Sequence, residues 1–406
     1  MISYVEARRM VAEAATTCFA AAPRRQERVA LAGVAGRVLA APLVADRDAP
    51  PFDRAARDGY ALRYSDIVKL PATLKLAGEI RAGAAFTDKI RVGECVQIMT
   101  GAAVPESVNA VVMIEHTTRE GDRVTFQRAV EKGANIVARG SEAKAGAEVV
   151  PAGRRMGPVE IAIAAQFGHA EMAVFERPRV AILTTGDEIV PMAETPEPFQ
   201  IRNSNRYSLA AQVVQAGGEP VELGQARDES AELRGKIEQG LKADALVLSG
   251  GVSMGKYDLV EDVLRELGAD FRFDAVAIRP GKPAVFGVCR GKPVLALPGN
   301  PVSTMVTFEL FGVPMVDVLS GAEARPLRLV KARLRHAVKL TAPLTHFIPA
   351  KLMWFGDDAH VAALTSQGSG DLAGLAQAEC FLVVPETKLE FAPGEWVDVL
   401  LWRDRM

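Results

Sequence analysis

The order of apolar and polar residues changes character several times along the chain. Residues 3–20 place apolar side chains at helical spacing, from Val5 through Val11 to Phe19, which predicts an amphipathic helix. The stretch DRDAPPFDRAARDGYAL contains consecutive prolines, which restrict the backbone and predict a loop. Residues 60–150 carry short apolar runs, including KLAGEI, ECVQIMTG and AVVMIEH, between glycine-bearing turns. This pattern predicts a small β-rich domain.

Residues 178–320 alternate between buried strands and amphipathic helices. The runs RVAILTT, EPVELGQA and DALVLS are predicted strands, and each is followed by a loop and a helix. Such alternation predicts a parallel sheet with right-handed crossovers. Residues 327–406 return to short apolar runs such as LRLVKARL, THFIPAKLMW and CFLVVP, which predict a compact β-barrel or sandwich. The pattern indicates a multidomain protein of the α/β plus β class.

Composition narrows the class of protein further. A length of 406 residues fits roughly two to four domains. The net charge of −2 and the pI of about 6.3 do not provide the basic domain of a nucleic-acid binder. Four widely spaced cysteines form no C-x-x-C pair, which argues against a zinc knot and is typical of a reducing cytosol. No signal-like segment opens the chain and no run approaches the ~18 apolar residues of a membrane span. We therefore expect a cytoplasmic protein without nucleic-acid or membrane partners.

Polar residues gather where the strands of the predicted α/β domain end. Ligands of open α/β sheets bind outside the carboxyl ends of the strands. In chain order these positions are Thr184, Thr185, Gly186, Asp187, Glu188, Asp228, Ser249, Gly250, Gly251, Ser253, Asp258, Arg279, Gly281, Lys282, Pro298, Gly299, Asn300, Pro301 and Ser303. Mg²⁺ takes one or two carboxylates together with substrate phosphates, and glycine-rich turns offer backbone N–H groups to phosphate. The combination predicts a Mg²⁺-assisted site for a phosphorylated ligand. An Asp or Ser before a helix is often only an N-cap, so that alternative stays open for Asp258 and Ser303.

The segment LSGGVSMGKYD resembles two other motifs. It almost spells the phosphate loop G-x-x-x-x-G-K-S/T, but Tyr257 stands where Ser or Thr would hold Mg²⁺. It also spells the nucleophile elbow G-x-S-x-G around Ser253. A triad would need a downstream histidine, and His336, His346 and His360 all fall in the β-rich tail. Both the nucleoside-triphosphatase and the serine-hydrolase interpretations are therefore disfavoured.

The motifs together resemble the MoeA family of molybdopterin molybdenumtransferases, to which the E domain of gephyrin belongs. The resemblance spans nearly the whole chain and rests on PFDRAARDGYAL, IMTGAAVPESVNAVVMIE, ILTTGDEIV, IRNSNRYSLAAQV, LVLSGGVSMGKYD, IRPGKPAVFG and LALPGNPVS, in the family's order.

The resemblance implies the last step of molybdenum cofactor synthesis. Adenylyl-molybdopterin and molybdate would react with Mg²⁺ as cofactor, AMP would be released, and molybdenum would enter the dithiolene. It also implies four domains: an elongated segment at 1–45 with 141–177, an inserted β-rich domain at 46–140, a MogA-like molybdopterin-binding α/β domain at 178–326, and a C-terminal β-barrel at 327–406. Members are homodimers whose active site lies across the interface. The implied partners are a MogA-type protein that hands over substrate and molybdoenzyme maturation factors that receive product.

The family's functional residues can be carried over by motif. Asp187, Glu188, Asp228 and Asp258 would hold Mg²⁺, and the last three, with Asp58 and Thr100 from the inserted domain, would be catalytic. The substrate-binding set would be Thr185, Gly186, Ser249, Gly250, Gly251, Ser253, Arg279, Lys282, Pro298, Gly299, Asn300, Pro301 and Ser303. Asp58 has the alternative interpretation of a simple turn residue before Gly59.

Three positions depart from the family's pattern. Arg57 stands where methionine is common, and Arg279 stands where lysine is often found. Arginine keeps the charge and can bind an oxyanion through two N–H groups. Asp371 replaces a neutral or basic residue, which puts an oxyanion role for Ser369 in doubt.

Two other functions are compatible with the same α/β domain. A MogA-type molybdopterin adenylyltransferase would share it, but the inserted domain and the tail argue against that as the sole activity. A non-catalytic scaffold, as gephyrin is for receptors, would not need the four carboxylates that this chain retains.

Overall fold

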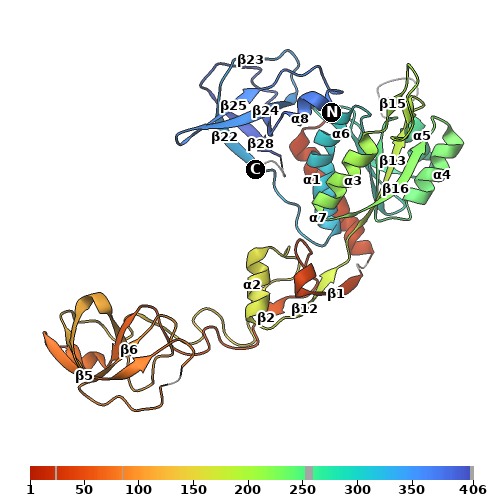
Figure 1. Ribbon diagram of the computed structural model, residues 1–406. Coiled ribbons are helices and arrows are strands. Elements are labelled where there is room, and N and C mark those ends of the chain that lie inside the picture. The colour runs from red at the N-terminus through yellow and green to blue at the C-terminus, as the bar shows by residue number, and fades with distance from the viewer. Residues whose placement is uncertain (23–24, 85, 252–258, 403–406) are drawn as a thin grey trace.

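The computed structural model of the protein describes residues 1–22, 25–84, 86–251 and 259–402. The α/β domain and the C-terminal barrel lie together at one end of an elongated molecule, and the inserted β-rich domain lies at the other (Figure 1). Between them stands a small segment in which β1 (Gln26–Ala30) pairs with β12 (Glu171–Phe175) and β2 (Leu43–Val44) pairs with β11 (Glu148–Val150). Helix α2 (Pro158–Gln166) packs beside these strands.

The inserted domain contains a six-stranded sheet in the order β7-β4-β6-β5-β9-β8. Its strands are β4 (Gly59–Leu62), β5 (Ala72–Ile80), β6 (Glu94–Ile98), β7 (Ala110–Met113), β8 (Thr117–Glu120) and β9 (Arg123–Phe126). The loop predicted around GYAL was wrong for β4, which is fully buried between β6 and β7. A Cβ on Gly59 would lie 1.9 Å from the carbonyl oxygen of Val112. The glycine that suggested a turn therefore permits the close approach of two strands.

The α/β domain is built on a six-stranded sheet in the order β16-β13-β17-β21-β20-β18. Four strands are parallel: β13 (Arg179–Thr185), β16 (Glu219–Ala226), β17 (Ala245–Ser249) and β21 (Lys292–Leu297). The predicted parallel sheet is extended at one edge by β20 (Val285–Cys289) and β18 (Asp270–Phe273), which are antiparallel. The two-residue turn Arg290–Gly291, with φ of 50° and 73°, closes a tight hairpin between β20 and β21.

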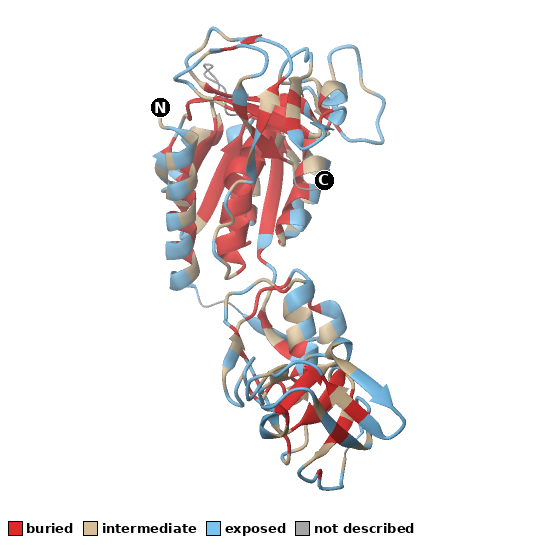
Figure 2. Ribbon diagram, turned by 90° about the vertical axis from the view of Figure 1, so that its left-hand side faces the viewer, coloured by how far each residue is buried: buried red, intermediate tan, exposed pale blue. Residues whose placement is uncertain are grey.

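Helices cover both faces of this sheet, as the alternation of its buried residues requires. Val180, Ile182 and Val247 pack with α1 (Tyr4–Ala21), α3 (Asn205–Ala216), α6 (Pro301–Thr307) and α7 (Val313–Leu319). The intervening residues Ala181 and Leu183 face α4 (Ser230–Gly240) and α5 (Leu259–Glu266) instead. Figure 2 shows the resulting continuous block of buried residues.

Among the described residues, one helical stretch, Pro301–Leu319, is long and apolar enough by length and composition to cross a membrane. The sequence interpretation did not anticipate this, because the stretch mixes apolar residues with Glu309 and Asp317. Of its most apolar 18-residue window, 89% is buried inside the protein. It is the central core helix, with a π-helical turn at Phe308–Gly312 between α6 and α7.

The C-terminal region is a closed five-stranded barrel, which decides between the predicted barrel and sandwich. Neighbours run β24-β25-β22-β28-β26, and β26 pairs back to β24. The strands are β22 (Leu329–Leu334), β24 (Thr345–Phe355), β25 (Asp358–Ala363), β26 (Cys380–Val384) and β28 (Trp396–Leu401). A short strand from the α/β domain, β19 (Ile278–Arg279), pairs with β24 and joins the two domains.

Candidate functional site

The carboxyl ends of β13 and β17 meet at the point where the strand order reverses. β13 pairs with β16 on one side and with β17 on the other, and the chain visits β16 before it returns to β17. Connections then leave in opposite directions and open a crevice at the strand ends. Thr185 ends β13, Ser249 ends β17 and Leu297 ends β21, so the predicted loops after these strands lie at one edge.

At this edge the glycine turn after β17 packs against the end of β13, and the glycine turn after β21 packs against the first turn. Gly250 has a φ of 97°, and a Cβ there would lie 2.4 Å from the carbonyl oxygen of Thr185. The N–H of Gly250 donates to the carbonyl of Leu297 (3.1 Å), and a Cβ on Gly299 would lie 3.5 Å from the Cα of Gly250. The predicted substrate-binding residues Thr185, Gly250, Gly251 and Gly299 are therefore brought together.

A buried polar network, which sequence reasoning missed, holds the turns after β17 and β21 through hydrogen bonds. Asn205 donates from Nδ2 to Ser249 Oγ (2.9 Å) and to the carbonyl of Gly299 (2.6 Å). Thr304 Oγ1 donates to the carbonyl of Pro298 (2.6 Å). The sequence did contain a sign of this network. Asn205 and Gln212 are polar residues on the face of α3 that also carries the buried residues Leu209, Val213 and Ala216.

Three of the predicted metal ligands form an exposed acidic cluster beside the turns. The N–H of Asp228 donates to Asp187 Oδ1 (3.3 Å), which joins the loops after β16 and β13. Partial burial, and then repulsion from Asp187 and Glu188, raises the pKa of Asp228. Gln225 holds the β13 loop in place by donating to the carbonyls of Gly186 and Ile189, both at 2.8 Å. The cluster concentrates negative charge that a cation would neutralise.

Two of the predicted residues, Ser253 and Asp258, lie outside the described residues. The N-cap interpretation of Ser303 was wrong, because this residue lies inside the first turn of α6 and is 4% exposed. It is not the N-cap, which is Asn300, and Pro301 follows as the first residue of the helix.

The basic turn RPGK lies next to α6, but it reaches that place differently from the prediction. Arg279 ends β19, which is not part of the α/β sheet and pairs instead with β24 of the barrel. A Cβ on Gly281 would lie 2.3 Å from Thr307 Cγ2, so the turn that carries Lys282 packs directly on α6. The sequence could not reveal the partner of so short a strand.

The C-terminal loop 366–371 also reaches this edge. Asn300 Nδ2 donates to Ser369 Oγ (2.9 Å), and the N–H of Val302 donates to the carbonyl of Ser369 (3.0 Å). Asp371, the residue that departs from the family's pattern, caps α8 (Leu372–Ala376) by accepting from the N–H of Gly374 (2.8 Å). Hydrogen bonds from the N–H groups of Gln367 and Gly374 lower the pKa of Asp371. Its charge is therefore engaged in local structure.

Asp58 and Thr100 form a second cluster in the inserted domain. Asp58 directly precedes β4 and Thr100 follows β6, and these strands are antiparallel partners with Gly59 opposite Ile98. The N–H and the hydroxyl of Thr100 donate to Asp58 Oδ1 at 2.6 and 2.7 Å and lower the pKa of Asp58. Within one chain this pair stands apart from the acidic cluster, at the opposite end of the molecule (Figure 1).

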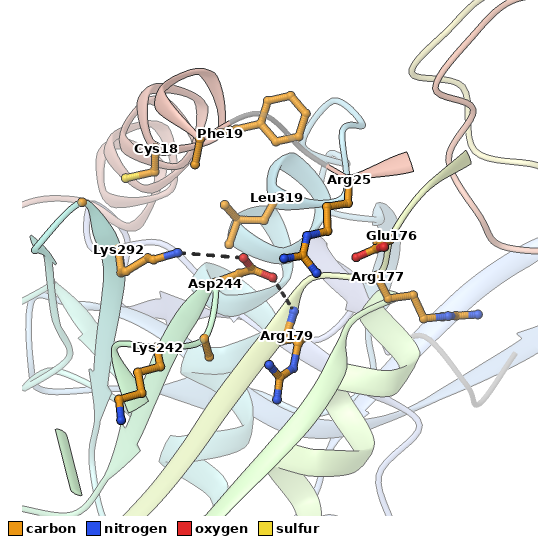
Figure 3. A pocket seen from close by; sticks show the side chains of 13 residues that line it. Cys18, Phe19, Arg25, Glu176, Arg177, Arg179, Lys242, Asp244, Lys292 and Leu319 are labelled. Atoms are coloured by element: carbon orange, nitrogen blue, oxygen red, sulfur yellow. Dashed lines mark hydrogen bonds and ion pairs between the residues drawn. The ribbon is translucent and has the colours of Figure 1, made fainter. Parts of the chain in front are cut away.

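A cavity of about 230 Å³ lies at the other edge of the α/β sheet, near the amino ends of β13, β17 and β21. None of the predicted site residues lines it. Arg25 and Lys292 turn toward its centre, where Lys292 Nζ lies 4.0 Å from Asp244 Oδ1, whereas Arg177 and Lys242 point outward (Figure 3). The cavity therefore does not form a convergent anion cradle.

Comparison with known proteins identifies relatives over the whole described architecture. Residues 2–168 match the MoeA N-terminal region (domain I and II), residues 181–318 match a family described as a probable molybdopterin binding domain, and residues 331–402 match the MoeA C-terminal region (domain IV). The molybdopterin molybdenumtransferase of Nostoc sp. is 35% identical over 376 residues, which span 90% of this chain and 86% of that protein. That of Bacillus subtilis is 32% identical over 387 residues, spanning 93% and 90%.

Solved structures agree with the sequence relatives. A molybdopterin biosynthesis moeA protein from Pyrococcus horikoshii superposes with a TM-score of 0.80 at 28% identity, covering 99% of this chain and 100% of that chain. A second structure of a moeA protein from the same organism gives a TM-score of 0.72 at 31% identity, with 99% of both chains covered.

Proposed function

The chain belongs to the MoeA family, and on that premise we propose that it is a molybdopterin molybdenumtransferase that inserts molybdenum into the molybdenum cofactor. The observation that carries this proposal is the edge at the carboxyl ends of β13, β17 and β21. There, glycine turns suited to phosphate lie beside the acidic cluster of Asp187, Glu188 and Asp228.

We propose that the substrates are adenylyl-molybdopterin and molybdate. Hydrolysis of the phosphoanhydride consumes one water and yields AMP and molybdopterin, which keeps its own phosphate. The two dithiolene thiols then bind molybdenum, and one oxygen of molybdate leaves with the two thiol protons as water. The turns at Ser249–Gly251 and Pro298–Asn300 would bind the phosphorylated part of the substrate. Arg279 and Lys282 would offset the negative charge of the leaving oxygens or of molybdate.

The acidic cluster offers carboxylate oxygens, which are ligands that Mg²⁺ prefers. Among the described residues, no group of three or more His, Cys, Asp or Glu side chains is arranged to hold a metal by itself. Mg²⁺ does not need such a cage, because it keeps several waters and shares one or two carboxylates with substrate phosphates. Asp187, Glu188 and Asp228 would hold it, with Asp258 as a further proposed ligand. When bound, it would neutralise charge that develops on the phosphate oxygens.

We further propose that the active site is completed by a second copy of the chain. Asp58 and Thr100 are hydrogen-bonded to each other and lie far along the molecule from the acidic cluster of the same chain. A symmetric dimer would allow the inserted domain of one protomer to reach the α/β domain of the other.

Molybdate-dependent release of AMP tests the proposal. Purified protein, adenylyl-molybdopterin, Mg²⁺ and molybdate are mixed, and AMP and active cofactor are measured. Asp228→Asn should lose most turnover, while Glu229→Gln, which removes a negative charge at the neighbouring position, should keep it. No molybdate-dependent AMP release by the unaltered protein would overturn the proposal. AMP incorporation from ATP into molybdopterin would instead indicate an adenylyltransferase.

Mixing two inactive variants tests the shared site separately. If Asp58→Asn and Asp228→Asn chains exchange at random, half of the dimers are mixed and each contains one intact shared site. Activity should then return to about a quarter of the unaltered level. A mixture that stays inactive, while mass spectrometry of chains with different isotope labels shows exchanged dimers, would contradict a site made by two chains.

A further inference from the structure

Asn205 occupies a position from which one side chain controls two separate loops. It is the first residue of α3, and it is 7% exposed. Its Nδ2 donates both to Ser249 Oγ, at the end of β17, and to the carbonyl oxygen of Gly299, in the turn after β21. No sequence motif had assigned a role to this residue.

The second of these bonds sets the orientation of a peptide plane. The carbonyl of Gly299 and the N–H of Asn300 belong to one planar trans peptide, so they point in opposite directions. Because Asn205 draws the Gly299 carbonyl into the buried network, the N–H of Asn300 is directed away from it. Thr304 holds the preceding carbonyl, that of Pro298, in the same way at 2.6 Å, and this directs the N–H of Gly299 outward.

The two outward N–H groups have the properties of an anion-binding turn. Gly299 and Asn300 are exposed, and among the described residues no hydrogen bond uses the backbone N–H of either one. The residues on both sides, Pro298 and Pro301, have no N–H of their own and restrict the backbone of the turn. Consecutive N–H groups that face the same side form a concavity that favours an oxyanion.

We propose that Asn205 is a positioning residue that orients the Gly299–Asn300 turn for the phosphate groups of the substrate. This inference deepens the proposed function and rests on it for the identity of the substrate. Asn205 does not touch the reacting atoms. Its amide links the turn after β21 to Ser249 and so sets the distance between the two glycine turns that a pyrophosphate-bearing ligand would bridge.

The same helix provides a matched control in Gln212, seven residues further along the buried face. Gln212 is 5% exposed and donates from Nε2 to the carbonyl of Met305 (3.1 Å), in the body of α6 rather than in the turn. The side-chain carbonyl oxygens of Asn205 and Gln212 are both buried without a hydrogen-bond partner among the described residues. Removing either amide should therefore have a similar effect on folding, but only Asn205 contacts the turn.

Titration with inorganic pyrophosphate in the absence of Mg²⁺ tests the inference without requiring turnover. The full-length protein should bind pyrophosphate, Asn205→Ala should bind it about tenfold more weakly, and Gln212→Ala should bind it as the unaltered protein does. Asn205→Asp should be weaker still, because a carboxylate would repel the Gly299 carbonyl. If Asn205→Ala folds poorly, Asn205→Ser keeps a small polar side chain and should show the same direction. Unchanged affinity in Asn205→Ala, or no pyrophosphate binding by the unaltered protein, would overturn the inference.

Turnover separates this inference from the proposed function. In Asn205→Ala, KM for adenylyl-molybdopterin should rise about tenfold with kcat within about threefold, since a binding interaction common to ground state and transition state is lost. Gln212→Ala should leave both parameters unchanged. If the unaltered protein is inactive but binds pyrophosphate more tightly than Asn205→Ala does, the proposed function is wrong and the positioning role stands. If the unaltered protein is active and Asn205→Ala behaves like Gln212→Ala, the proposed function stands and the positioning role is wrong.

Discussion

Replacing Gly250 by alanine adds one methyl group at a crowded point of the candidate site. The new Cβ would lie 2.4 Å from the carbonyl oxygen and 2.9 Å from Oγ1 of Thr185. Real Cβ contacts do not fall below 3.0 Å, so the loop after β17 must move away from β13 by roughly 0.6 Å, the difference between 3.0 and 2.4 Å. The atom in the way is backbone, which cannot rotate aside.

The magnitude follows from two separate costs. A side chain at a φ of 97° costs roughly 1–2 kcal/mol in backbone strain, and forced displacement in a packed region costs about 1–3 kcal/mol more. The expected loss is therefore about 2–5 kcal/mol. Gly224 is the matched control, because its φ is 78° and a Cβ there would meet nothing within 4 Å. Gly224→Ala should show the strain alone, about 1–2 kcal/mol.

Chemical denaturation and pyrophosphate titration are the assays. Gly250→Ala should be less stable than Gly224→Ala by about 1–3 kcal/mol, and it alone should lose at least about tenfold in pyrophosphate affinity, because the displaced loop carries the phosphate-binding turn. Equal stability of the two variants would refute the steric argument. Unchanged pyrophosphate affinity in Gly250→Ala would show that this turn is not part of the binding site.

Four further predictions concern charged groups. Asp317→Asn should cost about 3–5 kcal/mol in chemical denaturation, because the fully buried carboxylate binds Arg155 and Arg325; a loss below about 1 kcal/mol would contradict this. The raised pKa of Asp228 means that its ionised carboxylate destabilises the folded protein. Asp228→Asn should therefore unfold at a higher temperature than the unaltered protein at pH 7, and this difference should disappear as the pH falls below about 4. Mg²⁺ should raise the melting temperature of the unaltered protein more than that of Asp228→Asn, and equal shifts would argue against a metal at this cluster. Asp371→Ala should lower stability at neutral pH, with the difference lost as the pH falls through the lowered pKa of Asp371, and pH-dependent urea melts would measure it.

Local periodicity was sufficient for most elements. The helix predicted at 3–20 is α1 (Tyr4–Ala21), and the runs LRLVKARL, THFIPAKLMW and CFLVVP each contain a barrel strand. These elements could be predicted because their side chains point alternately toward and away from one core. The resulting apolar pattern is therefore visible in neighbouring residues. The failures fall where the pattern depends on a distant partner. The strand β4 was predicted as a loop because the reason for its glycine is a close contact with Val112, about fifty residues away in the chain.

The candidate site divides in the same way. The sequence by itself determined which polar residues end the strands, because a strand followed by a helix must expose its terminal loop at one edge of the sheet. It thereby predicted that Thr185, Gly250 and Asp228 lie at the same edge of the sheet. Only the tertiary structure decided that Asn205 donates to the turn after β21, that Arg279 lies on a strand paired with the barrel, and that Asp58 and Thr100 are hydrogen-bonded to each other. Each of these depends on which segments pack together across long separations in the chain, and local spacing carries no information about that choice.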